Sequence, residues 1–217
     1  MKKIIVTGGA GFIGSHLCER LVKAGSSVRV FDNFSSGNRN HEKILRAAGV
    51  EVIEGDLSDK DAVLRACENR DTVFHLAANP DISKAVSFPE IDFFQGTVLA
   101  QNVFEAARRV GISKIVYFSG SGVYGEHGSV VLAENHGPMR PISTYGASKL
   151  GCEALLCSYS HMFGIKSVAF RFANVVGGRQ THGVGFDFLR RLKKDPTKLV
   201  ILGDGSQSKS YIHVVDV

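Results

Sequence analysis

The stretch Ile4-Ile5-Val6-Thr7-Gly8-Gly9-Ala10-Gly11-Phe12-Ile13-Gly14 decides the fold of this chain. It joins a short apolar strand to the start of a helix through three glycines spaced three apart. Gly8 allows a sharp turn, Gly11 lets the backbone approach a ligand, and Gly14 lets helix and strand pack closely. The exposed N–H groups at the positive end of such a helix bind phosphate. The stretch therefore predicts a phosphate site, although a glycine-rich loop also serves as a plain turn.

A second predicted strand helps to decide between a phosphate site and a plain turn. Residues 28–31 are apolar and end at Asp32, eighteen residues beyond Gly14. A carboxylate at this place accepts hydrogen bonds from both hydroxyls of an adenosine ribose and repels a 2′-phosphate. The two stretches together favour a dinucleotide site that takes NAD rather than NADP.

Strands alternate with helices along the rest of the chain. We expect strands at 4–6, 28–31, 51–54, 72–76, 114–118 and 167–172, and helices at 13–25, 41–48, 62–68, 94–109 and 144–163. This alternation predicts an α/β fold with a doubly wound parallel sheet of the Rossmann type. A helix near 186–194 and a strand at 199–202 indicate a smaller second unit, so we expect domains at 1–173 and 174–217.

Composition limits the class of protein. The chain has 44% hydrophobic residues and a net charge of +5, which helps to attract an anionic substrate. Its basic residues are scattered, so we expect no binding to nucleic acid. No apolar run approaches the roughly 20 residues of a membrane span, and no signal-type segment follows Met1, so we expect a cytoplasmic protein without membrane contact. We also expect no metal site and reduced thiols at Cys18, Cys67, Cys152 and Cys157, because no CxxC pair occurs.

Tyr145 and Lys149 form a candidate catalytic pair. They lie four residues apart on a predicted helix, so both side chains project from one face. A phenol titrates near pH ~10, and a neighbouring ammonium together with an oxidised nicotinamide ring favours the phenolate. Tyr145 would then accept a proton from a sugar hydroxyl. An ordinary surface pair is the alternative, but the position after the fifth strand places the two residues beside the nucleotide crevice.

Two further polar residues lie at or near strand ends. Asp56 follows the third strand, where it either caps the next helix or accepts a hydrogen bond from the adenine amino group; the sequence does not separate these roles. His75 lies inside the fourth strand and is interpreted as a core histidine with a satisfied hydrogen bond.

These motifs, in this order and with Val123-Tyr124-Gly125 before the Tyr145 pair, resemble the extended short-chain dehydrogenase/reductase family. Within it the chain is most similar to nucleotide-sugar epimerases. Residues 31–37 resemble the UDP-glucose (UDP-galactose) 4-epimerase branch, and residues 203–207 and 211–217 resemble the signature of its substrate domain.

The resemblance implies a cofactor, a substrate and the residues that bind them. Tyr145 and Lys149 would be catalytic and would also contact the cofactor. Asn174 and Lys209 would face the diphosphate of a nucleotide-sugar substrate, and a homodimer is possible. The other residues implied to hold NAD are Gly8, Gly11, Phe12, Ile13, Asp32, Asn33, Gly37, Asp56, Leu57, Ala77 and Ala78.

The chain departs from the family pattern in several places. Gly120 stands where the family has a Ser or Thr that hydrogen-bonds the sugar, so Ser119, Ser121 or a water would have to replace it. Lys209 replaces a common arginine, which turns a bidentate phosphate clamp into a point charge. Phe93 replaces an asparagine near the cofactor. Family members continue past the signature that closes at Val217, so we expect an amino-terminal fragment or a truncated product.

The leading hypothesis is an NAD-dependent 4-epimerase, in which hydride leaves C4 of a nucleotide hexose and returns to the opposite face of the 4-keto sugar. A 4,6-dehydratase of the same family would need an acid pair where this chain has Ser121 and Gly122, which disfavours it. A module that binds NAD without turnover is the third possibility; Gly120 and the early ending favour it, whereas Tyr145 and Lys149 oppose it.

Overall fold

The computed structural model describes residues 1–35, 39–79, 81–128, 130–201, 203–206 and 208–217. The chain divides into two compact units, Met1–Phe172 and Ala173–Val217.

The first unit is built on a six-stranded parallel sheet. Its strands are β1 (Lys3–Thr7), β2 (Ser27–Asp32), β3 (Glu51–Glu54), β4 (Thr72–His75), β5 (Lys114–Gly120) and β6 (Lys166–Phe172). They lie in the order β3-β2-β1-β4-β5-β6, and all neighbours are parallel. The order reverses beside β1, which opens a crevice at the carboxyl ends of β1 and β4. The predicted Rossmann sheet is thereby confirmed.

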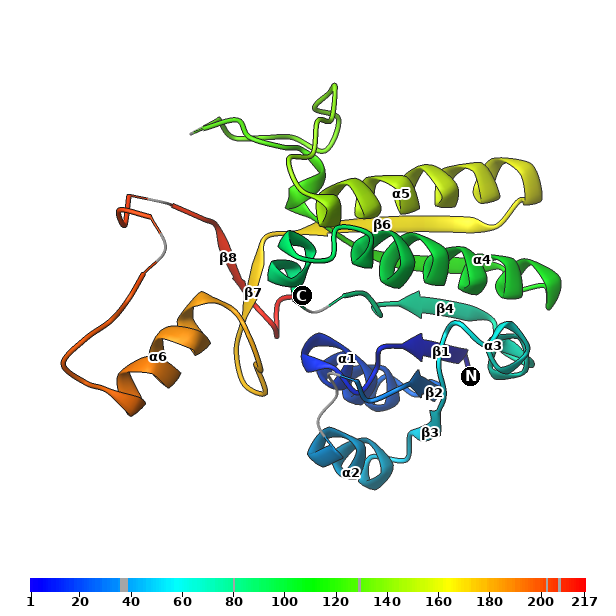
Figure 1. The fold of residues 1–217 in the computed structure, drawn as a ribbon. Helices are drawn as coiled ribbons and strands as arrows, with labels where there is room; N and C mark the ends of the chain where they lie inside the picture. The colour runs from blue at the N-terminus through cyan, green and yellow to red at the C-terminus, as the bar shows by residue number, and fades with distance from the viewer. Residues whose placement is uncertain (36–38, 80, 129, 202, 207) are drawn as a thin grey trace. The chain divides into compact units, whose positions relative to one another are not determined.

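Helices cover both faces of this sheet (Figure 1). On one face lie α1 (Phe12–Lys23) and α2 (Arg39–Ala47), and on the other α3 (Lys60–Cys67), α4 (Leu99–Arg109) and α5 (Thr144–Phe163). Side chains of β1 alternate between the two layers, because successive residues of a strand point to opposite faces. Ile4 and Val6 belong to the core under α1 and α2, whereas Ile5 belongs to the core under α3, α4 and α5.

The predicted helix at 94–109 has two parts. It begins as a π-helix, η2 (Phe93–Val98), and continues as α4. Gly96 of this π-helix lies so close to Ser148 of α5 that a Cβ would collide with the Ser148 hydroxyl. The irregular turn thus brings η2 against the helix that carries Tyr145 and Lys149, and such turns are frequent at functional sites. Short 3₁₀ segments lie at η1 (Ile82–Val86) and η3 (Ser121–Val123).

The second unit contains β7 (Asn174–Val176), which pairs in parallel with β8 (Tyr211–His213), and the helix α6 (Val184–Lys194). The strand predicted at 199–202 is wrong over 199–201, which form no strand; Leu202 lies outside the described residues. Val200 and Ile201 are exposed. An apolar run needs a neighbouring strand to satisfy its backbone, and here the Val200 carbonyl accepts a hydrogen bond from the Arg191 side chain instead.

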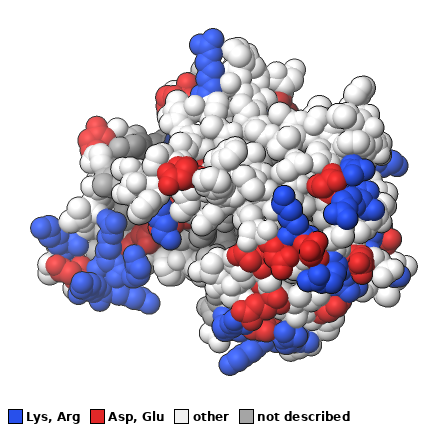
Figure 2. All heavy atoms as spheres, turned by 45° about the vertical axis from the view of Figure 1, so that its right-hand side comes forward, with Lys and Arg blue, Asp and Glu red and all other residues white. Residues whose placement is uncertain are grey.

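Charged side chains of both signs lie next to one another on the face of the molecule seen in Figure 2. In the first unit Glu51 pairs with Arg29 (2.9 Å) and Arg70 (3.2 Å), and Arg39 pairs with Glu54 (2.6 Å). Exposed pairs of this kind add little stability. In the described part of the chain, no helix is both long enough and apolar enough to span a bilayer.

Candidate active site

The glycine turn lies between the carboxyl end of β1 and the first turn of α1. Gly8 has φ +71°, and its N–H donates to the Phe31 carbonyl at 3.1 Å. A Cβ at this position would lie 2.7 Å from the Ala77 backbone nitrogen, and one at Gly14 would lie 2.7 Å from the Cα of Gly9. Only glycine fits at these two places, so the turn packs against Ala77 at the end of β4 and against its own helix.

Asp32 lies beside this turn at the end of β2. Its carboxylate is 9% exposed and accepts hydrogen bonds from the backbone N–H groups of Ala10 and Phe34, both at 2.9 Å. Burial raises the pKa of Asp32, and these two hydrogen bonds oppose the rise. His41, which the sequence analysis did not single out, contacts the Ala10 carbonyl through Nδ1 at 2.9 Å. The side chains of β2 and α2 therefore hold the glycine turn in place.

Asn33 and Asp56 meet at the ends of β2 and β3. The Asn33 amide donates to Asp56 Oδ2 at 2.8 Å, while Asp56 Oδ1 accepts from the backbone N–H and hydroxyl of Ser58. These hydrogen bonds lower the pKa of Asp56. The cap of α3 is Asp59, whose side chain accepts from the N–H groups of Asp61 and Ala62. Asp56 is thus not the cap, and its contact with adenine stays a prediction.

The remaining predicted cofactor residues fall into three groups. Phe12 and Leu57 are buried, 8% and 5% exposed, and Ile13 follows Phe12, the first residue of α1. Ala77 and Ala78 follow β4 directly. Gly37 lies outside the described residues.

These residues fit a dinucleotide. At Gly8, Gly11 and Gly14 a Cβ would lie too close to neighbouring backbone atoms, so the turn stays compact. The turn leads into a helix, and the buried Asp32 carboxylate lies beside it. A pyrophosphate requires N–H groups at the start of such a helix, and an adenosine ribose requires a hydrogen-bond acceptor.

Tyr145 and Lys149 lie on the first turns of α5. Ser143 caps the start of the helix, and its hydroxyl accepts from the Gly146 N–H at 3.0 Å. The Lys149 ammonium donates to the Phe118 carbonyl at 2.7 Å and lies 5.5 Å from the centroid of the Tyr145 ring. Burial lowers the pKa of Lys149 to about 8. Lys149 is therefore fixed by the end of β5, with the Tyr145 ring beside it.

Tyr145 is held in the protonated state in this environment. Burial, first, and the charge of Asp92, second, raise the pKa of the phenol to about 12. Lys149 alone does not produce the phenolate that the sequence analysis predicts.

Of the residues expected to replace the missing hydroxyl at Gly120, Ser119 is already engaged. It is 8% exposed and donates to Glu153 Oε1 at 2.5 Å. Glu153 in turn pairs with Arg171 at 2.7 Å. Ser121 is exposed at the start of η3, so its hydroxyl is the accessible one of the two.

Buried Asp92 and Asn79 and exposed Thr144 form a hydrogen-bonded group that the sequence analysis missed. Asp92 is 1% exposed and accepts from the Asn79 amide at 2.8 Å and the Thr144 hydroxyl at 2.7 Å. No spacing or motif links these positions in the sequence. Only the fold brings the end of β4, the start of η2 and the start of α5 together.

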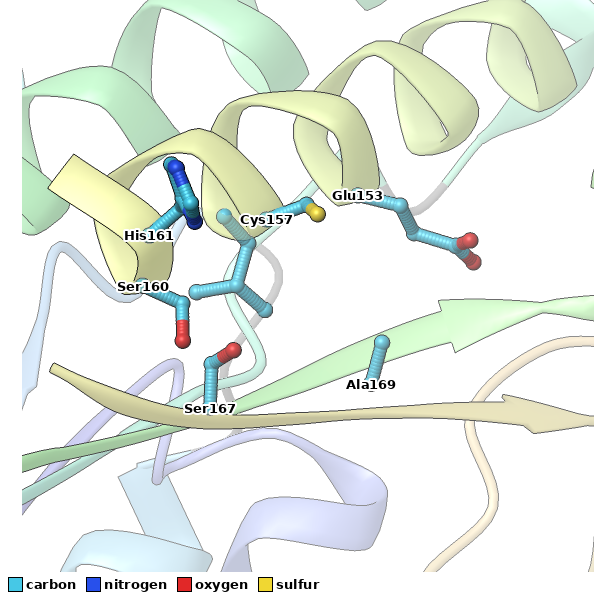
Figure 3. A pocket seen from close by; sticks show the side chains of 7 residues that line it. Glu153, Cys157, Ser160, His161, Ser167 and Ala169 are labelled. Atoms are coloured by element: carbon cyan, nitrogen blue, oxygen red, sulfur yellow. The ribbon is translucent and has the colours of Figure 1, made fainter. Parts of the chain in front are cut away.

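A hollow of about 560 Å³ lies elsewhere, between the second half of α5 and β6 (Figure 3). Its lining residues are Glu153, Leu156, Cys157, Ser160, His161, Ser167 and Ala169. None of the predicted site residues lines it, so it is separate from the site at the carboxyl ends of the strands.

The two predicted substrate residues both belong to the second unit. Asn174 opens β7 and donates through its side-chain amide to the Ser210 carbonyl at 3.3 Å. Lys209 is exposed and immediately precedes Ser210. The two side chains therefore come from neighbouring segments of one small ribbon, and their contact with a diphosphate stays a prediction.

Comparison with known proteins identifies the family. Residues 4–217 match the family described as the NAD dependent epimerase/dehydratase family. The chain belongs to this family. Its membership confirms the resemblance drawn from the sequence, and it supports NAD as the cofactor.

Relatives and solved structures of this family cover nearly the whole chain. A UDP-glucose 4-epimerase of Mycolicibacterium smegmatis is 34% identical over 99% of the chain and 70% of its own length. A crystal structure of a UDP-galactose 4-epimerase is 41% identical, with a TM-score of 0.89, over 99% of this chain and 68% of that one. A dTDP-glucose 4,6-dehydratase of Streptomyces venezuelae, solved as a double mutant with NAD bound, has a TM-score of 0.90 at 27% identity, over 98% of this chain and 68% of that one.

Proposed function

We propose that this protein is a nucleotide-sugar 4-epimerase that interconverts UDP-galactose and UDP-glucose with NAD as cofactor. Relatives that carry the name UDP-glucose 4-epimerase support the reaction. The observation that carries the proposal is the pair of half-buried Tyr145 and buried Lys149, which stands beside the end of β5 in a sheet whose glycine turn fits a dinucleotide.

The chain would bind the cofactor through the glycine turn and Asp32. The N–H groups of the turn would bind the pyrophosphate, and Asp32 would accept from the ribose hydroxyls. When bound there, NAD supplies a reversible hydride acceptor for C4 of the sugar. Lys149, fixed by the Phe118 carbonyl, would contact the nicotinamide ribose.

Tyr145 would move the proton. As the phenolate it accepts the proton of the sugar 4-hydroxyl, and as the phenol it returns a proton to the same oxygen after the sugar has turned over. The neighbouring Lys149 ammonium stabilises the phenolate through its charge. Because the proton and the reducing equivalent both return to the sugar, the reaction causes no net redox change.

The second candidate function is a 4,6-dehydratase. The structural similarity to the dTDP-glucose 4,6-dehydratase suggests it. Removal of water from C5 and C6 requires an acid and a base in addition to the tyrosine. Ser121 and Gly122 supply neither at the place where the resemblance expects an acid pair. The residues of this chain therefore favour the epimerase.

Incubation of the protein with NAD and either UDP-galactose or UDP-glucose tests the proposal. Nuclear magnetic resonance of the anomeric protons follows the appearance of the other sugar. Tyr145→Phe keeps the ring and removes the hydroxyl, so its rate should fall by ~10²–10⁴-fold while folding and NAD binding survive. Tyr124→Phe is the matched control, because its hydroxyl contacts Arg171 instead.

Nearly full activity in Tyr145→Phe would show that another group moves the proton. A 4-keto-6-deoxy product would identify the dehydratase, and NAD binding without turnover of either sugar would identify a non-catalytic module. Cytoplasmic location and a homodimer remain predictions, which cell fractionation and analytical ultracentrifugation test.

A further inference from the structure

Asp92 is a buried carboxylate that belongs to none of the motifs found in the sequence. It is 1% exposed and immediately precedes the π-helix η2. Oδ1 accepts from the Asn79 amide at 2.8 Å, and Oδ2 accepts from the Thr144 hydroxyl at 2.7 Å. Both oxygens act as acceptors, which is the pattern of an ionised carboxylate.

The two donors lie at the two sides of the proposed site. Asn79 follows Ala77 and Ala78, the segment that packs on the glycine turn, and Thr144 is the first residue of α5. Asp92 therefore joins the carboxyl end of β4 to the helical turn that presents Tyr145. A negative charge at the first turn of a helix is favourable, because it faces the positive end of the helix.

Among the described residues, charged or titratable groups approach Tyr145 from three elements. Asp92 approaches it from the segment before η2, Lys149 and Cys152 from its own helix, and Tyr117 from β5. Lys149 is the positive member, and its ammonium also donates to Phe118. Charges act strongly on one another at such buried positions. Asp92 and Lys149 thus act on the phenol with opposite sign.

We propose that Asp92 is a positioning residue of the site: it anchors the first turn of α5 through Thr144, and it places a negative charge near the Tyr145 phenol, opposite in sign to the charge of Lys149. The catalytic consequence rests on the proposed function, but the effect on Tyr145 itself does not. The raised pKa of the phenol agrees with this role.

The first test needs no enzymatic activity. The near-ultraviolet absorbance of tyrosinate is titrated in the ligand-free protein, and the same titration of a Tyr145→Phe version is subtracted to isolate Tyr145. Asp92→Asn keeps the shape, since the new amide can accept from Asn79 and donate to the Thr144 hydroxyl. We expect the midpoint for Tyr145 to move to lower pH by about 1 pH unit, because one buried like charge is removed.

Two controls separate charge from packing. Asp59→Asn removes a carboxylate that caps α3 and should leave the midpoint unchanged. Thr144→Val keeps the Asp92 charge and removes the hydrogen bond between residue 144 and Asp92. It should therefore lower kcat with little change in the titration midpoint of Tyr145. A midpoint in Asp92→Asn that equals the wild-type value, with circular dichroism showing an intact fold, would overturn the proposal.

If Asp92→Asn does not fold, the exchange variant Asp92→Asn with Asn79→Asp keeps one amide and one carboxylate in the pair. We expect its midpoint to lie below the wild-type value, because the charge has moved away from the start of η2. An unchanged midpoint contradicts the proposal here as well.

A second measurement addresses the reaction. If the protein is an epimerase, the acid limb of its kcat profile should move to lower pH in Asp92→Asn, in the same direction as the titration. A shifted titration in a protein that turns over neither sugar would support the role of Asp92 and refute the proposed function. A shifted titration with an unshifted kcat profile would show that Tyr145 is not the acid–base group.

Discussion

At the scale of single residues, the structure makes Gly120 a decisive position. Its backbone is extended, with φ −164°, which any residue adopts, and an added Cβ would meet only the Phe172 carbonyl oxygen at 4.0 Å. Gly120→Ser should therefore fold normally and present a hydroxyl in place of the one that the family pattern expects. If residue 120 contacts the sugar, we expect turnover to rise by roughly tenfold or more, because the new hydroxyl would restore a hydrogen bond to the transition state.

Gly122→Ser is the matched control, since it adds the same group two residues away, where the Cβ would make an ordinary 3.7 Å contact with Gly146. Steady-state rates of both variants decide the question. An unchanged rate in Gly120→Ser means that Ser121 or a water already supplies the contact.

Lys149 gives a prediction for pH. Its pKa is about 8 in the folded chain, against about 10.4 for an unperturbed lysine. Between these values the unfolded chain binds more protons than the folded chain, so this group makes the free energy of unfolding rise with pH. In Lys149→Met this contribution to the pH dependence is absent, because methionine does not titrate. The stability of the wild type relative to Lys149→Met should therefore increase from about pH 8 to about pH 10.5, by on the order of 3 kcal/mol.

Urea unfolding of the two proteins across this range measures the difference. Taking the difference cancels the other groups that titrate there, such as Cys67, whose pKa burial raises to about 12. A difference that stays flat or falls with pH would show that Lys149 is not buried as a charged group.

At the scale of elements, the sequence predicted the regular helices and strands well but missed the irregular backbone. The sequence placed α5 at 144–163, and the structure has it at Thr144–Phe163, because Ser143 caps its start and Gly164, in the left-handed region, ends it. Both are local signals. The π-helix η2 has no such signal, since it depends on the contact of Gly96 with another helix. The strand expected at 199–202 is wrong over the described residues 199–201 for the same reason, because apolar residues alone do not supply a neighbouring strand.

The cap of α5 can be tested separately from the catalytic residues. Ser143→Ala removes the acceptor for the Gly146 N–H and should lower the free energy of unfolding by about 1 kcal/mol. In a protein of this size that corresponds to a fall in Tm of about 2–4 °C. If α5 also has to hold Tyr145 in register, kcat should fall while the affinity for NAD stays constant. Ser158→Ala, a change on the exposed side of the same helix, provides the comparison.

At the scale of the whole molecule, the sequence predicted the sheet and the glycine turn well because both are set by short segments. Every strand of the large sheet was found within a few residues, and Asp32 lies next to the turn as expected. The hydrogen-bonded group of Asp92, Asn79 and Thr144 was not predicted, since its members come from three segments and contact one another only in the folded unit. Long-range polar contacts of this kind leave no periodic trace in a sequence.

The preference for NAD over NADP also belongs to this scale, because a bound ligand stabilises the whole folded state. At a concentration about 100 times its Kd, a ligand adds about 2.7 kcal/mol. We therefore expect NAD to raise Tm by roughly 5–10 °C. NADP should raise it much less, because its 2′-phosphate would lie close to the Asp32 carboxylate.

Asp32→Ala tests the cause of this preference. The substitution also leaves the N–H groups of Ala10 and Phe34 without their acceptor, so the ligand-free protein should unfold at a lower temperature. The informative quantity is therefore the shift that each ligand produces in the same variant. We expect the NAD shift to shrink, because the ribose loses its acceptor, and the NADP shift to remain or grow, because the repulsion is gone. Asp59→Ala removes a carboxylate with two similar backbone contacts away from the turn, so it should lower Tm and keep the wild-type preference. Equal shifts by NAD and NADP in the unaltered protein would mean that Asp32 serves only to hold the glycine turn in shape.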